Sequence, residues 1–259
     1  MASSLVGQVA VITGASSGIG WALAKALAAE GCKVGLIARR EEPLRTLTLE
    51  IAASGGTAAF AVADVSQSTS IAAGLASIRA ALGPLDLVVA NAGVGMPTRL
   101  DPANLADVEA MFNVNVLGMV YTFAAALPEM LARKTGRIVA ISSIAGYCGL
   151  PGESAYCASK AAVNAYMNGL RIHLRGTGVF ATTICPGFVR TPMTAMNTFH
   201  MPGLMTADVA ASRIVRAIVR GKKVSNFPWR LALLTKLSRW LPDAVLKRIM
   251  SGYEEEPKA

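Results

Sequence analysis

The chain has few of the side chains that usually hold a metal ion. Among 259 residues there are two histidines and four cysteines, and no two cysteines have the close spacing of a zinc site. The cysteines are Cys32, Cys148, Cys157 and Cys185. We therefore expect no metal site. Scattered thiols without a pairing pattern are typical of the reducing cytoplasm, which is the predicted location.

Charged residues are also scarce, at 16%, whereas hydrophobic residues make up 53%. This balance excludes a disordered chain and is typical of a sheet covered on both faces. No uncharged run is expected to reach the roughly 20 residues that span a bilayer. No basic segment followed by an apolar stretch predicts a signal peptide near the N-terminus.

The net charge of +9 is compatible with nucleic acid, an anionic membrane or a phosphate-bearing cofactor as partner. The basic side chains are diluted in apolar sequence and are not interleaved with aromatic residues, which disfavours a nucleic-acid surface. We expect no nucleic-acid partner.

Short apolar runs alternate with longer helical patterns. Buried parallel strands are predicted at residues 9–13, 34–38, 58–62, 85–90, 138–141 and 179–184, with a seventh at 223–227. Helices are predicted at residues 19–30, 42–54, 66–82, 105–133, 154–175 and 206–220. The alternation predicts one α/β domain over residues 1–259. Its core, at about residues 6–220, would be a Rossmann-type doubly wound parallel sheet of about seven strands with helices on both faces.

A glycine-rich turn follows the first predicted strand and opens the first helix. It reads Thr13-Gly14-Ala15-Ser16-Ser17-Gly18-Ile19-Gly20. Gly14 can form the tight turn, Gly18 lets the backbone approach a pyrophosphate, and Gly20 allows close packing of helix on strand. The free amides and the helix dipole then favour an anion. The turn is predicted to bind a dinucleotide, with Ser16, Ser17 and Ile19 among its contacts.

Two other readings of this turn exist. It can be an ordinary tight turn, since its glycine spacing departs from the common G-x-G-x-x-G. Residues 14–18 also match G-x-S-x-G, which would make Ser16 a hydrolase nucleophile with His200 as its base. The hydrolase reading is disfavoured, because no earlier strand precedes the turn to supply an oxyanion loop.

The second predicted strand ends in Arg39 and Arg40, without the acidic residue that would hold a ribose 2′-hydroxyl. A guanidinium can bind a 2′-phosphate through paired hydrogen bonds. The sequence therefore predicts NADP(H) in preference to NAD(H), with Arg39 as the main contact and Arg40 as a second; two solvated arginines are the alternative. After the third and fourth strands, further contacts are expected from Asp64 and Val65 at the adenine and from Asn91, Ala92 and Gly93 beside the adenosine ribose.

Tyr156 is the one tyrosine of five with a lysine, Lys160, four positions later. In a helix the two side chains share a face. The pKa of a phenol is about 10, and a neighbouring ammonium together with a positive nicotinamide would lower it, so that Tyr156 can exchange a proton with a substrate. Ser143, at the end of the fifth predicted strand, can polarise a carbonyl as charge develops. The alternative is an exposed tyrosine–lysine neighbour pair.

These segments, in this order, resemble the short-chain dehydrogenase/reductase family. The residues that carry the resemblance are Thr13, Gly14, Gly18, Gly20, Asn91, Ala92, Gly93, Asn115, Ser143, Tyr156, Lys160, Pro186, Gly187, Val189 and Thr191. The likeness implies a catalytic tetrad of Asn115, Ser143, Tyr156 and Lys160. It also favours Asn115 over the neighbouring Asn113, as the residue that kinks a helix and holds a water beside the lysine.

Further cofactor contacts are expected near the nicotinamide. Pro186 and Gly187 shape a turn after the sixth predicted strand, the backbone of Val189 can meet the carboxamide, and Thr191 can reach an amide or a phosphate. Tyr156 and Lys160 would also touch the cofactor, Lys160 through the nicotinamide ribose.

The substrate pocket is expected to be apolar. The loop over residues 192–205 is rich in methionine and has no acidic residue, which predicts an uncharged ketone or alcohol, although plain packing is the alternative. The expected wall residues are Val94, Met96, Ile144, Tyr147, Leu150, Phe188, Met193 and Met196.

Residues 228–250 predict a C-terminal extension of amphipathic helices, the first over residues 229–241. Its apolar stripe is expected to be Leu231, Leu234, Leu237 and Leu241, with Lys236 and Arg239 facing away. A basic amphipathic helix can lie on an anionic membrane. Packing over the substrate pocket or at a subunit interface is the favoured reading.

These patterns together predict an oxidoreductase that transfers a hydride between NADP(H) and a hydrophobic ketone or secondary alcohol, with Tyr156 as general acid and base. The alternatives are an NAD(P)-dependent dehydrogenase of steroid-like or acyl-chain substrates and, from another class, a dinucleotide-sensing protein without turnover. A homodimer or homotetramer is expected through the helices at 105–133 and 154–175. Contact with the inner membrane surface is an option for the extension.

Overall fold

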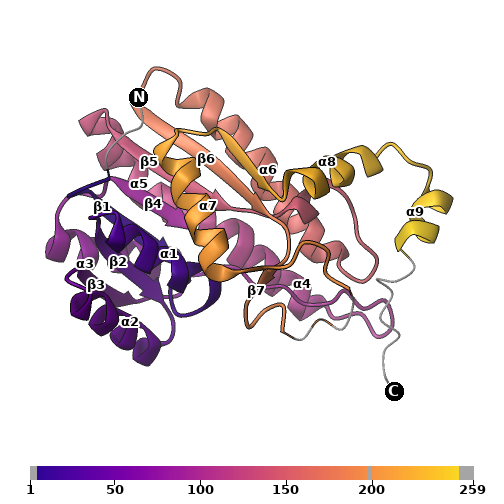
Figure 1. Cartoon of the computed structure of the whole chain (residues 1–259), viewed down its shortest axis with the longest axis horizontal. Coiled ribbons are helices and arrows are strands. Elements are labelled where there is room, and N and C mark those ends of the chain that lie inside the picture. Colours follow the sequence, from indigo (N-terminus) through magenta and orange to yellow (C-terminus); the bar gives the residue numbers. More distant parts are fainter. Residues whose placement is uncertain (1–4, 196, 198–199, 251–259) are drawn as a thin grey trace.

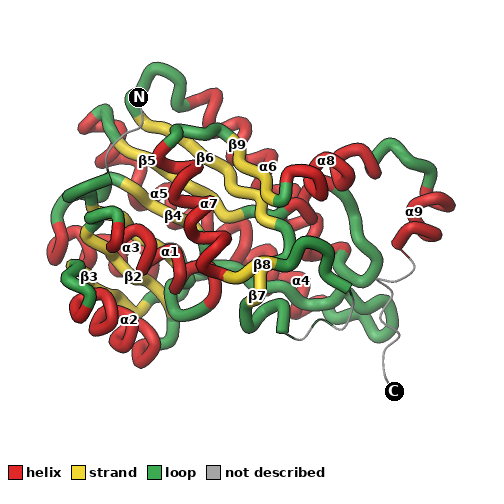
Figure 2. Tube along the Cα trace, viewed as in Figure 1, coloured by secondary structure: helices red, strands yellow, loops and turns green. Residues whose placement is uncertain are grey.

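A seven-stranded parallel sheet forms the centre of the computed structural model of the chain (Figure 2). The structure describes residues 5–195, 197 and 200–250. In spatial order the strands are β3 (Thr57–Val62), β2 (Lys33–Ala38), β1 (Val9–Thr13), β4 (Leu87–Ala90), β5 (Gly136–Ile141), β6 (Val179–Pro186) and β9 (Val224–Phe227). The seven predicted strands are confirmed, with small differences at their ends.

The order of the strands reverses between β1 and β4. The chain runs from β1 outward to β3, returns to β4 beside β1, and continues outward to β9. At such a reversal the connections leave the sheet in opposite directions and open a crevice at the carboxyl ends of the strands. One expectation is corrected here: β3 is not a fully buried strand, since Val62 is 50% exposed. The reason is that β3 is an edge strand.

Helices cover both faces of the sheet (Figure 1). On one face lie α1 (Gly18–Ala29), α2 (Glu41–Ala53) and α7 (Ala207–Val219). On the other lie α3 (Ser68–Leu82), α5 (Gly118–Arg133) and α6 (Ser154–His173). Each layer buries its own cluster, around Leu23 and Ile214 on the first face and around Phe123 and Met167 on the second. Two buried faces explain why the strands are apolar throughout.

The helix predicted over residues 105–133 is interrupted. After α4 (Leu105–Phe112) the chain makes a π-helical turn at Asn113–Leu117, and α5 begins at Gly118. Residues 110–128 also carry no charge, contrary to expectation. Among the described residues the stretch Leu105–Arg133, which contains an 18-residue window with a mean hydropathy of 1.5, is the one helix long and apolar enough to cross a membrane. Its α5 part packs Met119 and Phe123 into the core of the sheet, as a core helix does.

The C-terminal extension forms two helices, α8 (Trp229–Ser238) and α9 (Asp243–Met250). The predicted apolar stripe of α8 is wrong. Leu231 and Ala232 face the protein, whereas Leu234 and Leu237 are 64% and 55% exposed. Lys236 does not face away, because its ammonium lies 4.5 Å from the centre of the Tyr147 ring. The prediction was wrong because it assumed that every large apolar residue of the helix faces the protein, whereas several of them are exposed.

Candidate active site

The glycine turn is a close-packed bend between β1 and α1. Gly14 and Gly18 have φ angles of 69° and 58°, which side chains rarely adopt. A Cβ on Gly14 would lie 2.7 Å from the Cα of Ala92, and a Cβ on Gly20 would overlap the carbonyl oxygen of Gly14. The turn therefore needs glycine at these positions for shape. The separate roles predicted for Gly14 and Gly20 agree with this geometry.

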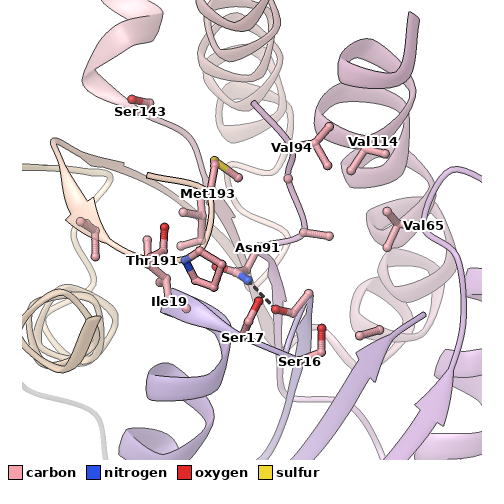
Figure 3. Close-up of a pocket in the computed structure, with 18 of the residues that line it drawn as sticks. Ser16, Ser17, Ile19, Val65, Asn91, Val94, Val114, Ser143, Thr191 and Met193 are labelled. Carbon is pink, nitrogen blue, oxygen red and sulfur yellow. Dashed lines mark hydrogen bonds between the residues drawn. The ribbon is translucent and has the colours of Figure 1, made fainter. Parts of the chain in front are cut away.

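Asn91, at the end of β4, holds the turn from below. Its side-chain amide donates to the carbonyl oxygens of Thr13 (2.9 Å) and Gly14 (3.3 Å), and its backbone N–H donates to the Thr13 hydroxyl at 3.1 Å. The dashed line in Figure 3 marks the bond from the Asn91 side chain to the glycine turn. The carboxylate of Asp64, after β3, accepts hydrogen bonds from the backbone N–H and the hydroxyl of Ser66 at 2.9 and 2.8 Å. Both side chains thus order the crevice, and the sequence alone did not reveal this.

The two arginines after β2 both reach the crevice and are exposed. One Nη of Arg40 donates to the hydroxyl and the carbonyl oxygen of Ser16, at 3.0 and 3.3 Å. Arg40 therefore contacts the glycine turn directly. The prediction that Arg39 is the main contact of a 2′-phosphate, with Arg40 as a second, stays a prediction. Ser16 is held by this guanidinium.

Tyr156 and Ser143 come together at the carboxyl end of β5. Tyr156 lies in the first turn of α6, and the ammonium of Lys160 is 5.7 Å from the centre of its ring. The Ser143 hydroxyl hydrogen-bonds Tyr156 and accepts the backbone N–H of Ala145 at 3.1 Å, which fixes the start of the 3₁₀ helix Ile144–Tyr147.

Lys160 and Asn115 lie deeper, at 5% and 2% exposure. The ammonium of Lys160 donates to the carbonyl oxygen of Ile141 at 3.0 Å. Asn115 sits in the π-helical turn, where its oxygen accepts the N–H of Val94 (2.8 Å) and its NH₂ donates to Val94 (2.9 Å) and Ser159 (3.0 Å). The helix distortion expected at Asn115 is present.

The electrostatics of this group differ from the expectation. Burial raises the pKa of Tyr156 to about 12, and the hydrogen bond with Ser143 opposes this only in part. Burial lowers the pKa of Lys160 to about 8. The lysine alone therefore does not bring the phenol near neutrality in the free protein, and Tyr156 is a neutral acid there.

A cleft of about 340 Å³ joins these parts. Every predicted cofactor residue lines it except Gly20, which packs beneath the turn. In Figure 3, Ile19 and Thr191 lie on one side of the cleft and Val65 and Val114 on the other. The lining residues that sequence reasoning missed are Ala38, Ala63, Val114, Ile141, Ser142, Pro192 and Thr194. Most of these residues are neighbours in sequence of a predicted site residue. Their position at the end of a predicted strand could therefore have indicated them.

A smaller pocket of about 150 Å³ opens beside the cleft and shares Ser143, Tyr156 and Met193 with it. Four of the expected substrate residues line it, namely Ile144, Leu150, Phe188 and Met193. Of the others, Val94 lines the first cleft, and Met96 and Tyr147 line neither cavity. Met196 lies outside the described residues.

Several residues of this pocket were not among the predicted site residues. They are Gly95, Ala145, Glu153, Thr194, Asn197, Leu231 and Thr235. Glu153, just before α6, brings a carboxylate to a wall expected to be free of charge. Leu231 and Thr235 come from one face of α8. The extension therefore covers the pocket, as the favoured reading held, and the i, i+4 spacing of Leu231 and Thr235 was the signal available.

The fold and the cleft together define a class of protein. A doubly wound sheet with a glycine turn at its switch point, opening on a buried lysine and a tyrosine, is the architecture of a dinucleotide-dependent oxidoreductase. The glycine turn leaves no room for side chains at Gly14 and Gly20. The backbone N–H groups at the start of α1 suit a pyrophosphate, as those of a helix N-terminus do.

Comparison with known proteins identifies the family. Residues 8–201 match the short chain dehydrogenase family, and the chain belongs to it. It is 42% identical to an uncharacterized oxidoreductase of Myxococcus xanthus, over 93% of this chain and 97% of that one. The protein is accordingly an NAD(P)-dependent oxidoreductase, and the hydrolase reading of Ser16 is wrong.

Solved structures show the same fold with either nucleotide. A metagenomic short-chain oxidoreductase in complex with NADP has 36% identity and a TM-score of 0.73, covering 86% of this chain and 97% of that one. A short chain dehydrogenase/reductase from Burkholderia phymatum in complex with NAD has 27% identity and a TM-score of 0.86, covering 99% of both. A nicotinamide dinucleotide is therefore the cofactor of this fold.

Proposed function

We propose that the protein transfers a hydride between NADP(H) and a hydrophobic ketone or secondary alcohol. The observation that carries this proposal is the junction of the two cavities: Ser143 and Tyr156 line both the cleft with the glycine turn and the apolar pocket. A substrate carbonyl at the junction would meet a proton donor and a hydroxyl beside the cofactor cleft.

Tyr156 is the general acid in this proposal. Bound NADPH would supply the hydride for the carbonyl carbon. Tyr156 would give its phenolic proton to the carbonyl oxygen, and the Ser143 hydroxyl would hydrogen-bond that oxygen as charge develops. Lys160, held by Ile141, would orient the cofactor ribose and favour the phenolate that remains. Asn115 would hold α6 through its hydrogen bond to Ser159 and the segment after β4 through its hydrogen bonds with Val94.

The pKa values favour reduction near neutral pH. With a pKa of about 12, Tyr156 is fully protonated and ready to donate. Oxidation would need the phenolate, and moving that pKa to about 7 requires about 7 kcal/mol. A cation about 4 Å from the phenolate oxygen would supply about 4 kcal/mol at an effective dielectric constant of about 20. The oxidised cofactor would have to contribute the rest.

NADP(H) is the preferred nucleotide in this proposal. Arg39 and Arg40 stand where β2 ends, and both line the cleft. The acids that follow, Glu41 and Glu42, belong to the first turn of α2, where Glu41 pairs with Arg45 at 2.6 Å, and neither lines the cleft. Arg40 would bind the 2′-phosphate while bracing Ser16, so both arginines, rather than chiefly Arg39, would discriminate. Asp64 would reach the adenine.

The substrate in this proposal is an apolar, uncharged carbonyl compound or alcohol. Ile144, Leu150 and Phe188 favour an alkyl or aryl ketone, and steroid-like or acyl-chain substrates remain the alternative. Glu153 disfavours a carboxylate or phosphate at that wall.

The protein would work as a homodimer or homotetramer. Apolar residues stay exposed on the helices expected to form the interface: Leu117, Leu131, Tyr166 and Ile172. The cytoplasmic location and a single domain over residues 1–259 stay predictions.

The test is consumption of NADPH by the purified protein across a panel of apolar ketones, with NADH run in parallel. We expect turnover with NADPH and weaker turnover with NADH. Binding of NADPH without any turnover would contradict the proposal and favour the dinucleotide-sensing alternative.

A further inference from the structure

The C-terminal extension has two faces with different surroundings. The inner face of α8 covers the small pocket with Leu231 and Thr235, and Ala232 is buried against Ile144. Figure 1 shows α8 and α9 projecting from the body of the protein beyond α6. The residues of α8 that line the small pocket and pack on Ile144 thus lie on one side of this helix.

The outer face of the extension is apolar and exposed. Trp240 is 83% exposed, and Trp229 is 65% exposed. We use the name outer face for the exposed large apolar side chains of the extension, which are Trp229, Leu233, Leu234, Leu237, Trp240, Leu241, Val245 and Ile249. Scattered exposed apolar residues are ordinary, but this many on one projecting segment indicates a binding surface.

Cations accompany the outer face. Arg230 stacks near the Trp229 ring at 5.4 Å, Arg239 is exposed directly after α8, and Lys247 is exposed on α9. Asp243 is the one acidic residue of α8 and α9. When Glu254, Glu255 and Glu256 are included, residues 228–259 still hold six cations against four acids.

We propose that the outer face of the extension docks on an anionic lipid surface. Tryptophan favours the membrane interface, leucine and isoleucine enter the acyl boundary, and flanking cations attract anionic headgroups. A second copy of the chain fits less well. Two copies joined through this face would bring two sets of cations into one contact, and Asp243 is the one acid that α8 and α9 of each copy offer.

Docking would place the small pocket next to the lipid, because Leu231 and Thr235 on the inner face line it. Apolar substrates dissolved in the bilayer could then reach Tyr156 without crossing much water. This part rests on the proposed function, whereas docking itself does not.

The test is co-sedimentation of the full chain with vesicles of neutral lipid and with vesicles containing anionic lipid. We expect binding to the anionic vesicles only, weakened by salt. The double variant Leu234→Glu/Trp240→Glu should abolish it, and each of Arg239→Glu and Lys247→Glu should weaken it by at least about fivefold, since one surface cation is worth about 1 kcal/mol. Leu49→Glu, at an exposed site on α2, is the matched control and should bind as the wild type does.

Several outcomes would overturn docking. Wild-type protein that stays in solution with anionic vesicles excludes it, as does a double variant that still sediments. If the double variant instead changes the mass in solution and the wild type does not bind vesicles, the outer face joins two copies. Turnover of a soluble ketone should be similar in wild type and variants, so a dead wild type that still binds vesicles would refute the proposed function alone.

Discussion

At the scale of single residues, burial controls the chemistry of the site. Lys160 is nearly inaccessible and its ammonium has one carbonyl partner, from Ile141. Tyr156 is shielded by the same packing, and both pKa values shift toward the neutral forms. The spacing of Tyr156 and Lys160 was predictable from sequence, but their burial was not, because it depends on segments far away in the chain.

Stability at alkaline pH should report on Lys160. Its pKa is about 8 in the folded protein and about 10.5 unfolded, so between these pH values the unfolded chain binds more protons there. The contribution of Lys160 to the free energy of unfolding therefore rises with pH. Relative to Lys160→Met, wild type should gain about 2 kcal/mol between about pH 7.5 and about pH 9.5 in urea unfolding. Lys33→Met, at an exposed site, should show no such gain; a flat difference for Lys160→Met would refute the shift.

Cofactor choice should depend on both arginines. Arg39→Ala and Arg40→Ala should each weaken NADPH binding about 10- to 100-fold, because a hydrogen bond to a charged group is worth about 1.5–3 kcal/mol. NADH binding should change little for Arg39→Ala and more for Arg40→Ala, since Arg40 also holds Ser16. Titration calorimetry with both nucleotides would measure this. Equal losses for NADPH and NADH in Arg39→Ala would count against a 2′-phosphate contact.

At the scale of elements, regular periodicity was a sound guide and irregular positions were not. The strands from β1 to β6 and most of the helices were predictable from apolar runs and glycine boundaries. The π-helical turn at Asn113–Leu117 was not, since its residues fit an α-helix equally well. The face of α8 that packs against the protein was also predicted wrongly, because this helix has leucines on both its buried and its exposed sides.

Tyr147 contacts α8, the helix that covers the small pocket. It was expected to line the substrate pocket itself. Its hydroxyl donates to Asn226 at 2.8 Å and lies 3.2 Å from the sulfur of Cys185, while Lys236 of α8 rests over its ring. Loss of the hydroxyl should loosen the wall that Leu231 supplies.

Tyr147→Phe should therefore raise KM for the ketone severalfold and leave kcat within about twofold, because no reacting atom is touched. Steady-state kinetics at saturating NADPH would measure both constants. Tyr166→Phe, at an exposed site on α6, is the control. A fall in kcat at constant KM would mean that Tyr147 acts on the catalytic group instead.

At the scale of the whole molecule, two unused surfaces remain on the monomer. One is the outer face of the extension, and the other is formed by the helices on the α4–α6 side. Ile172 is 66% exposed on α6, and Tyr166, Leu117 and Leu131 are also exposed on these helices. A group of exposed apolar side chains on one surface indicates a contact with another protein.

Assembly should fail when that second surface is charged. Ile172→Glu should reduce the mass in solution, measured by light scattering, from that of a dimer or tetramer toward that of the 26.9 kDa chain. Phe180→Glu, an equally exposed position at the start of β6, should leave the mass unchanged. A monomeric wild type would refute the interface, whereas a smaller mass in both variants would indicate unfolding or a different interface.

The most direct test of the whole account is NADPH oxidation with a ketone substrate by wild type and by Tyr156→Phe, both shown to bind NADPH. The variant lacks only the phenolic hydroxyl and with it the transferable proton, so kcat should fall about 100- to 10,000-fold while NADPH affinity stays nearly constant. Tyr166→Phe should behave as wild type. Turnover by Tyr156→Phe at the wild-type rate would contradict the central claim that Tyr156 supplies the proton.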